Sequence, residues 1–128
     1  MEKRIFDTYY YIDEQGYSPV KEFIFRLNKK EKAKIKAYIN ELRMLGHNLR
    51  RPMADYLGEG IYELRPKHNR VFYFFYLRTG IVFVHAIHKK TKKIPPSDIQ
   101  ICLKRKNQIE LEEKYIEKTE LEVKYGKN

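Results

Sequence analysis

Three short runs of aromatic and β-branched residues constrain the fold of this chain more than any other feature. They cover residues 61–65, 70–77 and 81–87, and residues of these types favour pleated strands. Only four residues separate the first two runs, and only three separate the second pair. Connections this short join antiparallel neighbours, so the sequence predicts a three-stranded antiparallel meander.

A strongly basic segment follows the last predicted strand. Residues 88–93 read HKKTKK, and the two prolines that follow at 95 and 96 predict the start of a helix. The whole chain carries 27 Lys and Arg against 17 Asp and Glu, a formal net charge of +10. This charge indicates an acidic partner, with nucleic acid first and an anionic membrane surface second, although a basic surface without a partner stays open. An apolar sheet with a cationic end is the geometry expected of a polyanion-binding protein.

The N-terminal part of the chain predicts one strand and two helices. Residues 4–12 are rich in tyrosine and isoleucine and are expected to form a strand. Ser18, followed by a proline, has the pattern of a helix N-cap and first helical position. Asn28 and Glu31 have the spacing of a capping box, which predicts a second helix that ends at Gly46. We expect these helices to form a hairpin packed on the sheet.

The linking segment and the C-terminus have less regular patterns. Residues 53–57 are expected to form a helical turn before the glycines at 58 and 60. Beyond Lys106 the composition turns acidic, and this tail is expected to be either a projecting helix or partly disordered. We therefore predict one domain over residues 1–106 and a charged helical extension or tail, not a separate domain, over residues 107–128.

Cysteine content and hydropathy bear on the compartment. The single cysteine, Cys102, excludes an internal disulfide and is expected to be a small core residue. The N-terminus lacks the continuous apolar core of a signal peptide, and no run reaches the roughly 20 apolar residues of a membrane span. We expect a cytoplasmic protein without a membrane-bound part.

Three motifs in the chain carry a family resemblance. They are YSPVKEF from residue 17, IYELR from residue 61 with RVF from residue 70, and VHAIHKKTKK from residue 84. In this order and at this spacing the motifs resemble the HigB-like, phage-derived branch of the RelE/ParE toxin superfamily. The resemblance covers most of residues 5–106.

This resemblance implies both a fold and a function. The implied fold is a RelE-like compact α+β domain, in which an N-terminal strand and a two-helix hairpin pack on a small, mainly antiparallel sheet with a C-terminal helix. The implied protein is the toxin of a type II toxin–antitoxin system, a ribosome-dependent mRNA endonuclease (an mRNA interferase). Its implied partners are mRNA on the ribosome and a HigA-like helix-turn-helix antitoxin. Two other hypotheses stay open: a non-enzymatic RNA- or ribosome-binding protein, and a ParE-like inhibitor of DNA gyrase.

RNA can be cleaved without a metal ion when its own 2′-hydroxyl attacks the adjacent phosphate. The protein must then supply a base, an acid and cations for the charge that develops on the phosphate. Arginine binds two phosphate oxygens with its planar fork, and lysine supplies a mobile point charge. For this charge stabilisation the sequence offers Arg65, Arg70, Lys89, Lys90 and Lys92.

The resemblance assigns positions to the same residues. Arg65 falls on the basic residue that closes the family's E-L-R strand. Arg70 falls on the arginine that contacts the scissile phosphate in related toxins. Lys89, Lys90 and Lys92 fall on the K-K-T-x-K segment after the last strand, whereas the tyrosine that some relatives use near this end has no match.

Two histidines are the remaining candidates for the acid and the base, because an imidazole titrates near neutral pH. His85 and His88 are three residues apart on a predicted strand, so their side chains are expected to point to opposite faces. By alternation, His88 shares a face with Lys90, and His85 shares a face with Ile81 and Phe83. The sequence does not decide between them.

We expect the functional cations to lie together along one margin of the sheet. No metal ligands and no cofactor are expected, because acidic or cysteine partners for a metal are absent near the histidines. The expected catalytic residues are Arg65, Arg70, His85, His88 and Lys90, and the expected RNA-binding residues are Lys67, Lys89, Lys92, Lys93, Arg50 and Arg51.

Overall fold

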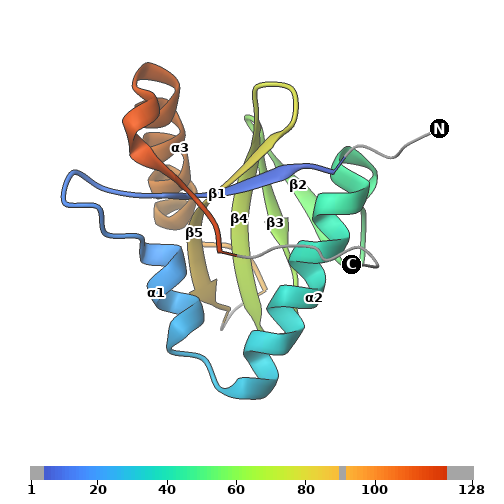
Figure 1. Ribbon diagram of the computed structural model, residues 1–128. Helices are drawn as coiled ribbons and strands as arrows, with labels where there is room; N and C mark the ends of the chain where they lie inside the picture. The colour runs from blue at the N-terminus through green and yellow to red at the C-terminus, as the bar shows by residue number, and fades with distance from the viewer. Residues whose placement is uncertain (1–4, 90–91, 121–128) are drawn as a thin grey trace, which may run out of the picture.

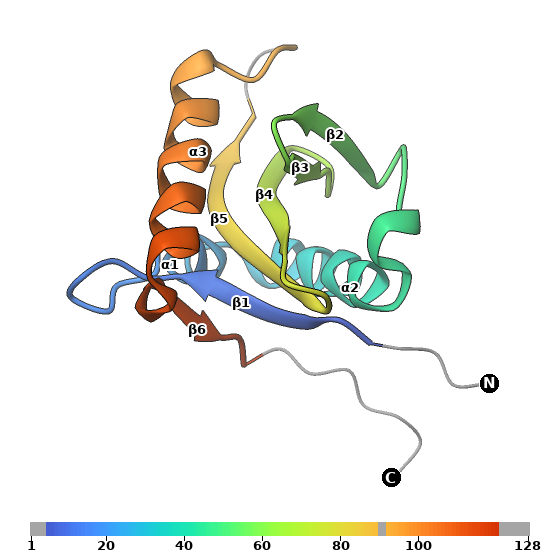
Figure 2. The same ribbon diagram turned by 90° about the horizontal axis from the view of Figure 1, so that it is seen from above.

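One mixed sheet organises the chain in the computed structural model, which describes residues 5–89 and 92–120. Within these residues the sheet has six strands in the order β2-β3-β4-β5-β1-β6 (Figure 1; β6 is labelled in Figure 2). Neighbouring strands pair antiparallel except β1 with β5, which pair parallel. The strands are β1 (Asp7–Tyr11), β2 (Ala54–Gly58), β3 (Ile61–Leu64), β4 (Asn69–Tyr76), β5 (Gly80–His88) and β6 (Ile116–Lys118).

The predicted meander is confirmed and forms one half of this sheet. Strand β4 lies between β3 and β5 and pairs antiparallel with both. Its residues from Asn69 to Phe74 are all buried, because helices cover both faces of the sheet. A strand buried on both faces requires continuous apolar sequence, and this requirement explains the unbroken run of valine and aromatic residues that begins at Val71.

Helices pack against the two faces of the sheet. On one face lie α1 (Pro19–Phe25) and α2 (Lys29–Leu45), whose buried residues join a core with the sheet. On the other face lies α3 (Pro96–Leu111), which buries Cys102 and Ile109 in a second core (Figure 2). The sheet is therefore the middle layer of three, and the predicted α+β fold class is confirmed.

The helix start and stop signals in the sequence are confirmed. The Ser18 hydroxyl accepts a hydrogen bond from the backbone N–H of Lys21 at the start of α1. Asn28 and Glu31 form the predicted capping box at the start of α2. This helix ends at Gly46, where φ is +54° and an added Cβ would collide with the Phe6 ring. A single 3₁₀ turn, η1 (Gly46–Asn48), follows.

A β-bulge in β5 reverses the predicted alternation of its side chains. Phe72 pairs with His85 and Tyr73 with Phe83, so Val84 is an extra residue in the ladder. One inserted residue changes the face on which every later side chain lies. His85 therefore faces α3, and the prediction that it shares a face with Ile81 and Phe83 is wrong. The prediction that His85 and His88 lie on opposite faces is confirmed.

Two other segments also differ from expectation. Residues 54–58 form strand β2 rather than a helical turn, because pairing with β3 outweighs the local pattern. After α3, the 3₁₀ turn η2 (Glu113–Tyr115) leads into β6, so this part of the acidic tail is an edge strand and not a projecting helix. Tyr115 is buried and stacks on Tyr11, and this contact holds the segment against the sheet. The domain boundaries at residues 106 and 107 stay a prediction.

None of the helices in residues 5–89 and 92–120 combines the length and the apolar composition that a bilayer crossing needs.

The capping box predicts a measurable loss of stability. Replacing Asn28 by Ala leaves the N–H of Glu31 without its acceptor, and we expect the free energy of unfolding to fall by about 1 kcal/mol. The measurement is urea unfolding followed by circular dichroism. Asn28→Asp keeps an acceptor and should retain most of the wild-type stability, whereas equal losses in both variants would contradict the assignment.

Candidate functional site

A cationic cavity lies on the α3 side of the sheet, where the β2–β3 hairpin meets the segment between β5 and α3. Its volume is about 480 Å³. The hairpin supplies residues from both strands, Arg51 and Arg65 flank the hairpin, and the segment between β5 and α3 and the first turn of α3 supply the rest. The lining residues are Arg51, Asp55, Leu57, Glu63, Arg65, Lys89, Lys92, Lys93, Ile94 and Ile99.

The cavity is suited to an anion. Five of its lining side chains are cationic and two are carboxylates, so the local charge is positive. Clustered charges of one sign in a concave site raise the local concentration of oppositely charged ligands. The structure thus brings together Arg65, Lys89, Lys92 and Lys93 at one margin of the sheet, the arrangement expected from the sequence.

A buried carboxylate lies among these cations. Glu63 is only 5% exposed, and its Oε2 atom lies 3.8 Å from Nε of Arg65. Its Oε1 atom lies 3.6 Å from Nε of Arg70, and neither of these two atoms has a hydrogen-bond partner among the described residues. Burial raises the pKa of Glu63, while the charges of Arg70, Arg65 and Lys89 oppose the shift. Glu63 is therefore a titratable group on the wall of the cavity, and its Oε1 atom is buried without a hydrogen-bond donor among the described residues.

Sequence reasoning assigned no function to Glu63. Its signal in the sequence is a single charged residue inside an apolar strand, at an inward position of β3. A charge at such a position is rare unless it is paired. This signal identifies a buried ion pair but does not show that the carboxylate faces a cavity.

Arg70 has a different position from the other cations. It is 8% exposed and does not line the cationic cavity. Its Nη1 atom donates hydrogen bonds to the backbone oxygens of Lys67 and Asn69, at 2.7 and 2.9 Å. Arg70 thus holds the β3–β4 turn and the Glu63 carboxylate, and its direct contact with a phosphate stays a prediction.

His85 is held in a contact between β5 and α3. Its Nε2 atom lies 2.7 Å from Oδ1 of Asp98, and its ring stacks on Phe72 with ring centroids 5.6 Å apart. Arg105 donates to the backbone oxygen of Val84 and lies 3.4 Å from Nδ1 of His85. Burial lowers the pKa of His85, and the hydrogen bond with Asp98 opposes that shift. His85 does not line the cationic cavity, and these contacts are those of a residue that fixes α3.

The remaining predicted residues lie elsewhere. His88 is on the α2 side of the sheet, with Nδ1 at 3.1 Å from Oδ1 of Asn69. Lys67 lines a separate cavity of about 250 Å³ beside α2. Arg50 lines a third cavity, and Arg51 lines both that one and the cationic cavity. Lys90 falls outside the described residues.

Metal and thiol chemistry have no site in the described residues. No group of three or more His, Cys, Asp or Glu side chains there is placed to hold a metal ion. Cys102 is buried in the α3 core, and burial raises the pKa of its thiol to about 12. A thiol with this pKa is protonated at neutral pH and is not a nucleophile.

Comparison with known families gives one result. Residues 22–107 match the model of a family described as phage derived protein Gp49-like (DUF891). The match covers more than half of the chain and includes α2, the meander and the cationic cavity. No curated protein matches the sequence.

The pKa of His85 predicts how stability depends on pH. Since the folded-state pKa lies below the unfolded value of about 6.5, the unfolded chain takes up the proton first as the pH falls. The contribution of His85 to stability is therefore fully present above the unfolded-state pKa, and it is lost as the pH falls below the two pKa values. The measurement is the free energy of unfolding in urea at several pH values. When the pH is lowered from about 7.5 to about 5, we expect this free energy to fall less in His85→Gln than in the wild type. His47→Gln, which removes an exposed imidazole, is the control, and identical pH dependence in all three proteins would contradict the prediction.

The Glu63–Arg70 pair predicts a cost for removing one partner. Arg70→Met leaves the buried carboxylate without its nearest cation, and we expect a loss of about 3–5 kcal/mol in the free energy of unfolding at pH 7. This loss should shrink as the pH falls, because protonation removes the charge of Glu63. A double variant with Glu63→Met as well should recover much of the stability. Additive losses in calorimetric or urea measurements would show that the two side chains do not interact.

Proposed function

The chain belongs to the Gp49-like family of phage-derived proteins, and from this premise we propose that it is a HigB-like toxin that cleaves mRNA on the ribosome. The observation that carries the proposal is the buried carboxylate of Glu63 in a cavity lined by five cationic side chains. A cavity of this kind can both bind a phosphodiester and accept a proton beside it.

Glu63 is the proposed base of the reaction. It accepts the proton of the 2′-hydroxyl, whose oxygen then attacks the adjacent phosphorus. A base is most effective when its pKa lies near the working pH, and burial moves the pKa of Glu63 in that direction. Arg70 acts as a positioning residue, because its ion pair and its two hydrogen bonds to backbone oxygens fix the carboxylate.

Cations on the wall of the cavity bind the phosphate. Arg65 is oriented by its ion pair with Glu63 and offers a planar fork to two phosphate oxygens. Lys89 and Lys92 add point charges that stabilise the negative charge of the transition state. The leaving 5′-oxygen takes its proton from one of the ammonium groups, since no histidine is among the described residues that line the cavity. Lys90, outside the described residues, belongs to the same basic segment and stays a candidate for this role.

The proposed partners follow from the same hypothesis. A HigA-like antitoxin with a helix-turn-helix domain would hold the toxin inactive, and mRNA would enter the cavity when the protein is bound to the ribosome. The net charge of +10 favours attraction to ribosomal RNA in any orientation, so the specificity must come from shape and from the cavity.

Variants of the cavity should lose RNA cleavage while the fold persists. Brief expression in bacterial cells, followed by mapping of RNA 5′ ends, measures cleavage. We expect Glu63→Gln to lower the cleavage rate by about 10²–10⁴-fold, the usual contribution of a general base. Arg65→Ala should lower the rate as well, because the phosphate loses its two-point contact. Arg78→Ala, in the β4–β5 turn at the opposite end of the sheet, is the matched control and should cleave like the wild type.

The same experiment separates the rival functions. Arrested growth with intact transcripts and inhibited DNA supercoiling would identify a ParE-like gyrase inhibitor and contradict the proposal. Normal growth with intact transcripts, and ribosome binding that survives Glu63→Gln, would identify a non-enzymatic RNA-binding protein. Because Glu63→Gln leaves Arg70 without its anion, thermal unfolding of each variant must accompany the assay.

A further inference from the structure

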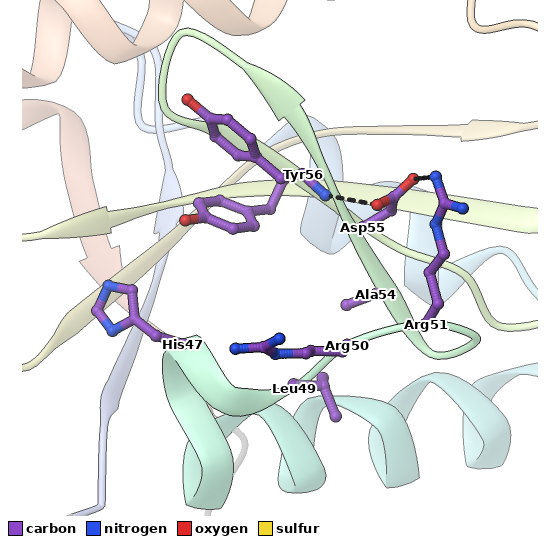
Figure 3. A pocket seen from close by; sticks show the side chains of 8 residues that line it. His47, Leu49, Arg50, Arg51, Ala54, Asp55 and Tyr56 are labelled. Atoms are coloured by element: carbon purple, nitrogen blue, oxygen red, sulfur yellow. Dashed lines mark hydrogen bonds and ion pairs between the residues drawn. The ribbon is translucent and has the colours of Figure 1, made fainter.

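A second cavity adjoins the cationic cavity on the opposite side of the β2–β3 hairpin. Its volume is about 420 Å³, within the range of small-ligand pockets. It lies between the end of α2 and the hairpin, and Figure 3 shows its side chains. We call it the tyrosine cavity, and its lining residues are His47, Leu49, Arg50, Arg51, Ala54, Asp55, Tyr56 and Tyr62.

The aromatic wall of this cavity is exposed but held in place. The Tyr56 ring is 53% exposed, and its hydroxyl accepts a hydrogen bond from the backbone N–H of Gly60 at 2.9 Å. Tyr56 and Tyr62 have ring centroids 4.7 Å apart, and Tyr62 in turn stacks on the buried Tyr73. An exposed ring that is already fixed loses little conformational entropy when a planar ligand stacks on it.

The charges of the cavity favour an anionic ligand with a planar part. The guanidinium of Arg50 points toward His47, whereas that of Arg51 turns the other way and pairs with Asp55 at 2.9 Å (Figure 3). Arg50 is exposed and has no ion pair among the residues that the structure describes. Aromatic rings beside an available arginine are the combination by which proteins bind single-stranded nucleic acid, since rings stack on bases and cations contact phosphates.

The tyrosine cavity and the cationic cavity share two lining residues at one edge of the sheet. Arg51 and Asp55 line both cavities; Asp55 lies at the start of β2, and Arg51 lies in the turn before it. Among the described strands, β2 is an edge strand with β3 as its neighbour, and no further described strand separates the two sides. A single strand of RNA that passes around this edge can therefore occupy both cavities at once.

From these observations we propose that the tyrosine cavity binds a base of the same RNA strand whose phosphate occupies the cationic cavity. The inference rests on the proposed function in one respect, because it takes RNA as the substrate. It adds a binding subsite, in which Tyr56 stacks on the base and Arg50 contacts a flanking phosphate. The subsite fixes which phosphodiester of the strand reaches Glu63.

A binding experiment tests this subsite without cleavage. The probe is a fluorescent 2′-O-methyl oligonucleotide of about eight nucleotides, which lacks the attacking hydroxyl, and a matched set carries one abasic position each. We expect Tyr56→Ala to weaken binding of the intact probe by about tenfold, the usual size of one base-stacking contact. With the probe that is abasic at the stacked position, Tyr56→Ala should change the affinity little, because that contact is already absent.

Two control variants and one further test variant make the result decisive. Tyr17→Ala removes a tyrosine of matched exposure, 51%, that lines none of the cavities described above, and it should bind like the wild type. Tyr56→Phe keeps the ring and should retain most of the affinity. Arg50→Ala changes an exposed side chain and should weaken all probes alike, by loss of a phosphate contact.

Specific outcomes overturn the subsite. The first is that the wild-type protein does not bind the probe. The second is that Tyr56→Ala and Tyr17→Ala bind the intact probe with equal affinity. The third is that Tyr56→Ala lowers the affinity for every abasic probe by the same factor. The subsite is also overturned if an antitoxin peptide binds in the tyrosine cavity and Tyr56→Ala leaves the affinity for RNA unchanged. The proposed function is tested separately, and it fails if transcripts stay intact in cells that express the protein. In that case, binding of the uncleavable probe that depends on Tyr56 would still support the subsite.

Discussion

Burial of β4 on both faces is the constraint on which the rest of the structure depends. The strand supplies Val71 and Tyr73 to the core under α1 and α2, and Phe72 and Phe74 to the core under α3. Helices must therefore cover both faces, and the N-terminal hairpin and α3 do so. The polar residues at the start of β4, Asn69 and Arg70, are buried with the strand and need partners within the protein.

The site follows from how these buried polar groups are paired. Glu63 on β3 is the counter-charge of Arg70, yet their closest atoms are 3.6 Å apart and form an ion pair without a hydrogen bond. An ion pair that is buried and loosely joined contributes little net stability, since desolvation offsets the attraction. The cations of the β5–α3 segment line the same cavity as this carboxylate.

Short-range signals allowed much of the fold to be predicted. The connections at residues 66–69 and 78–80 are too short for any arrangement except hairpins, and the capping pattern at Asn28 depends on neighbours within one helical turn. The bulge at Val84 could not be predicted, because it depends on how β5 pairs with β4 and leaves no local pattern. The edge strand β6 has the same cause: its partner, β1, lies at the other end of the chain.

The sequence by itself determined the meander, the helix boundaries, the α+β class and the presence of a basic segment after the last strand. These features depend on residues close together in the chain, where side-chain size, turn length and capping act directly. Only the tertiary structure decided which charged residues meet. It placed Arg65, Lys89 and Lys92 around Glu63, buried Arg70 beneath them, and turned His85 toward Asp98. The physical reason is that strand pairing and the bulge set the face of each side chain, and both arise from contacts between distant segments.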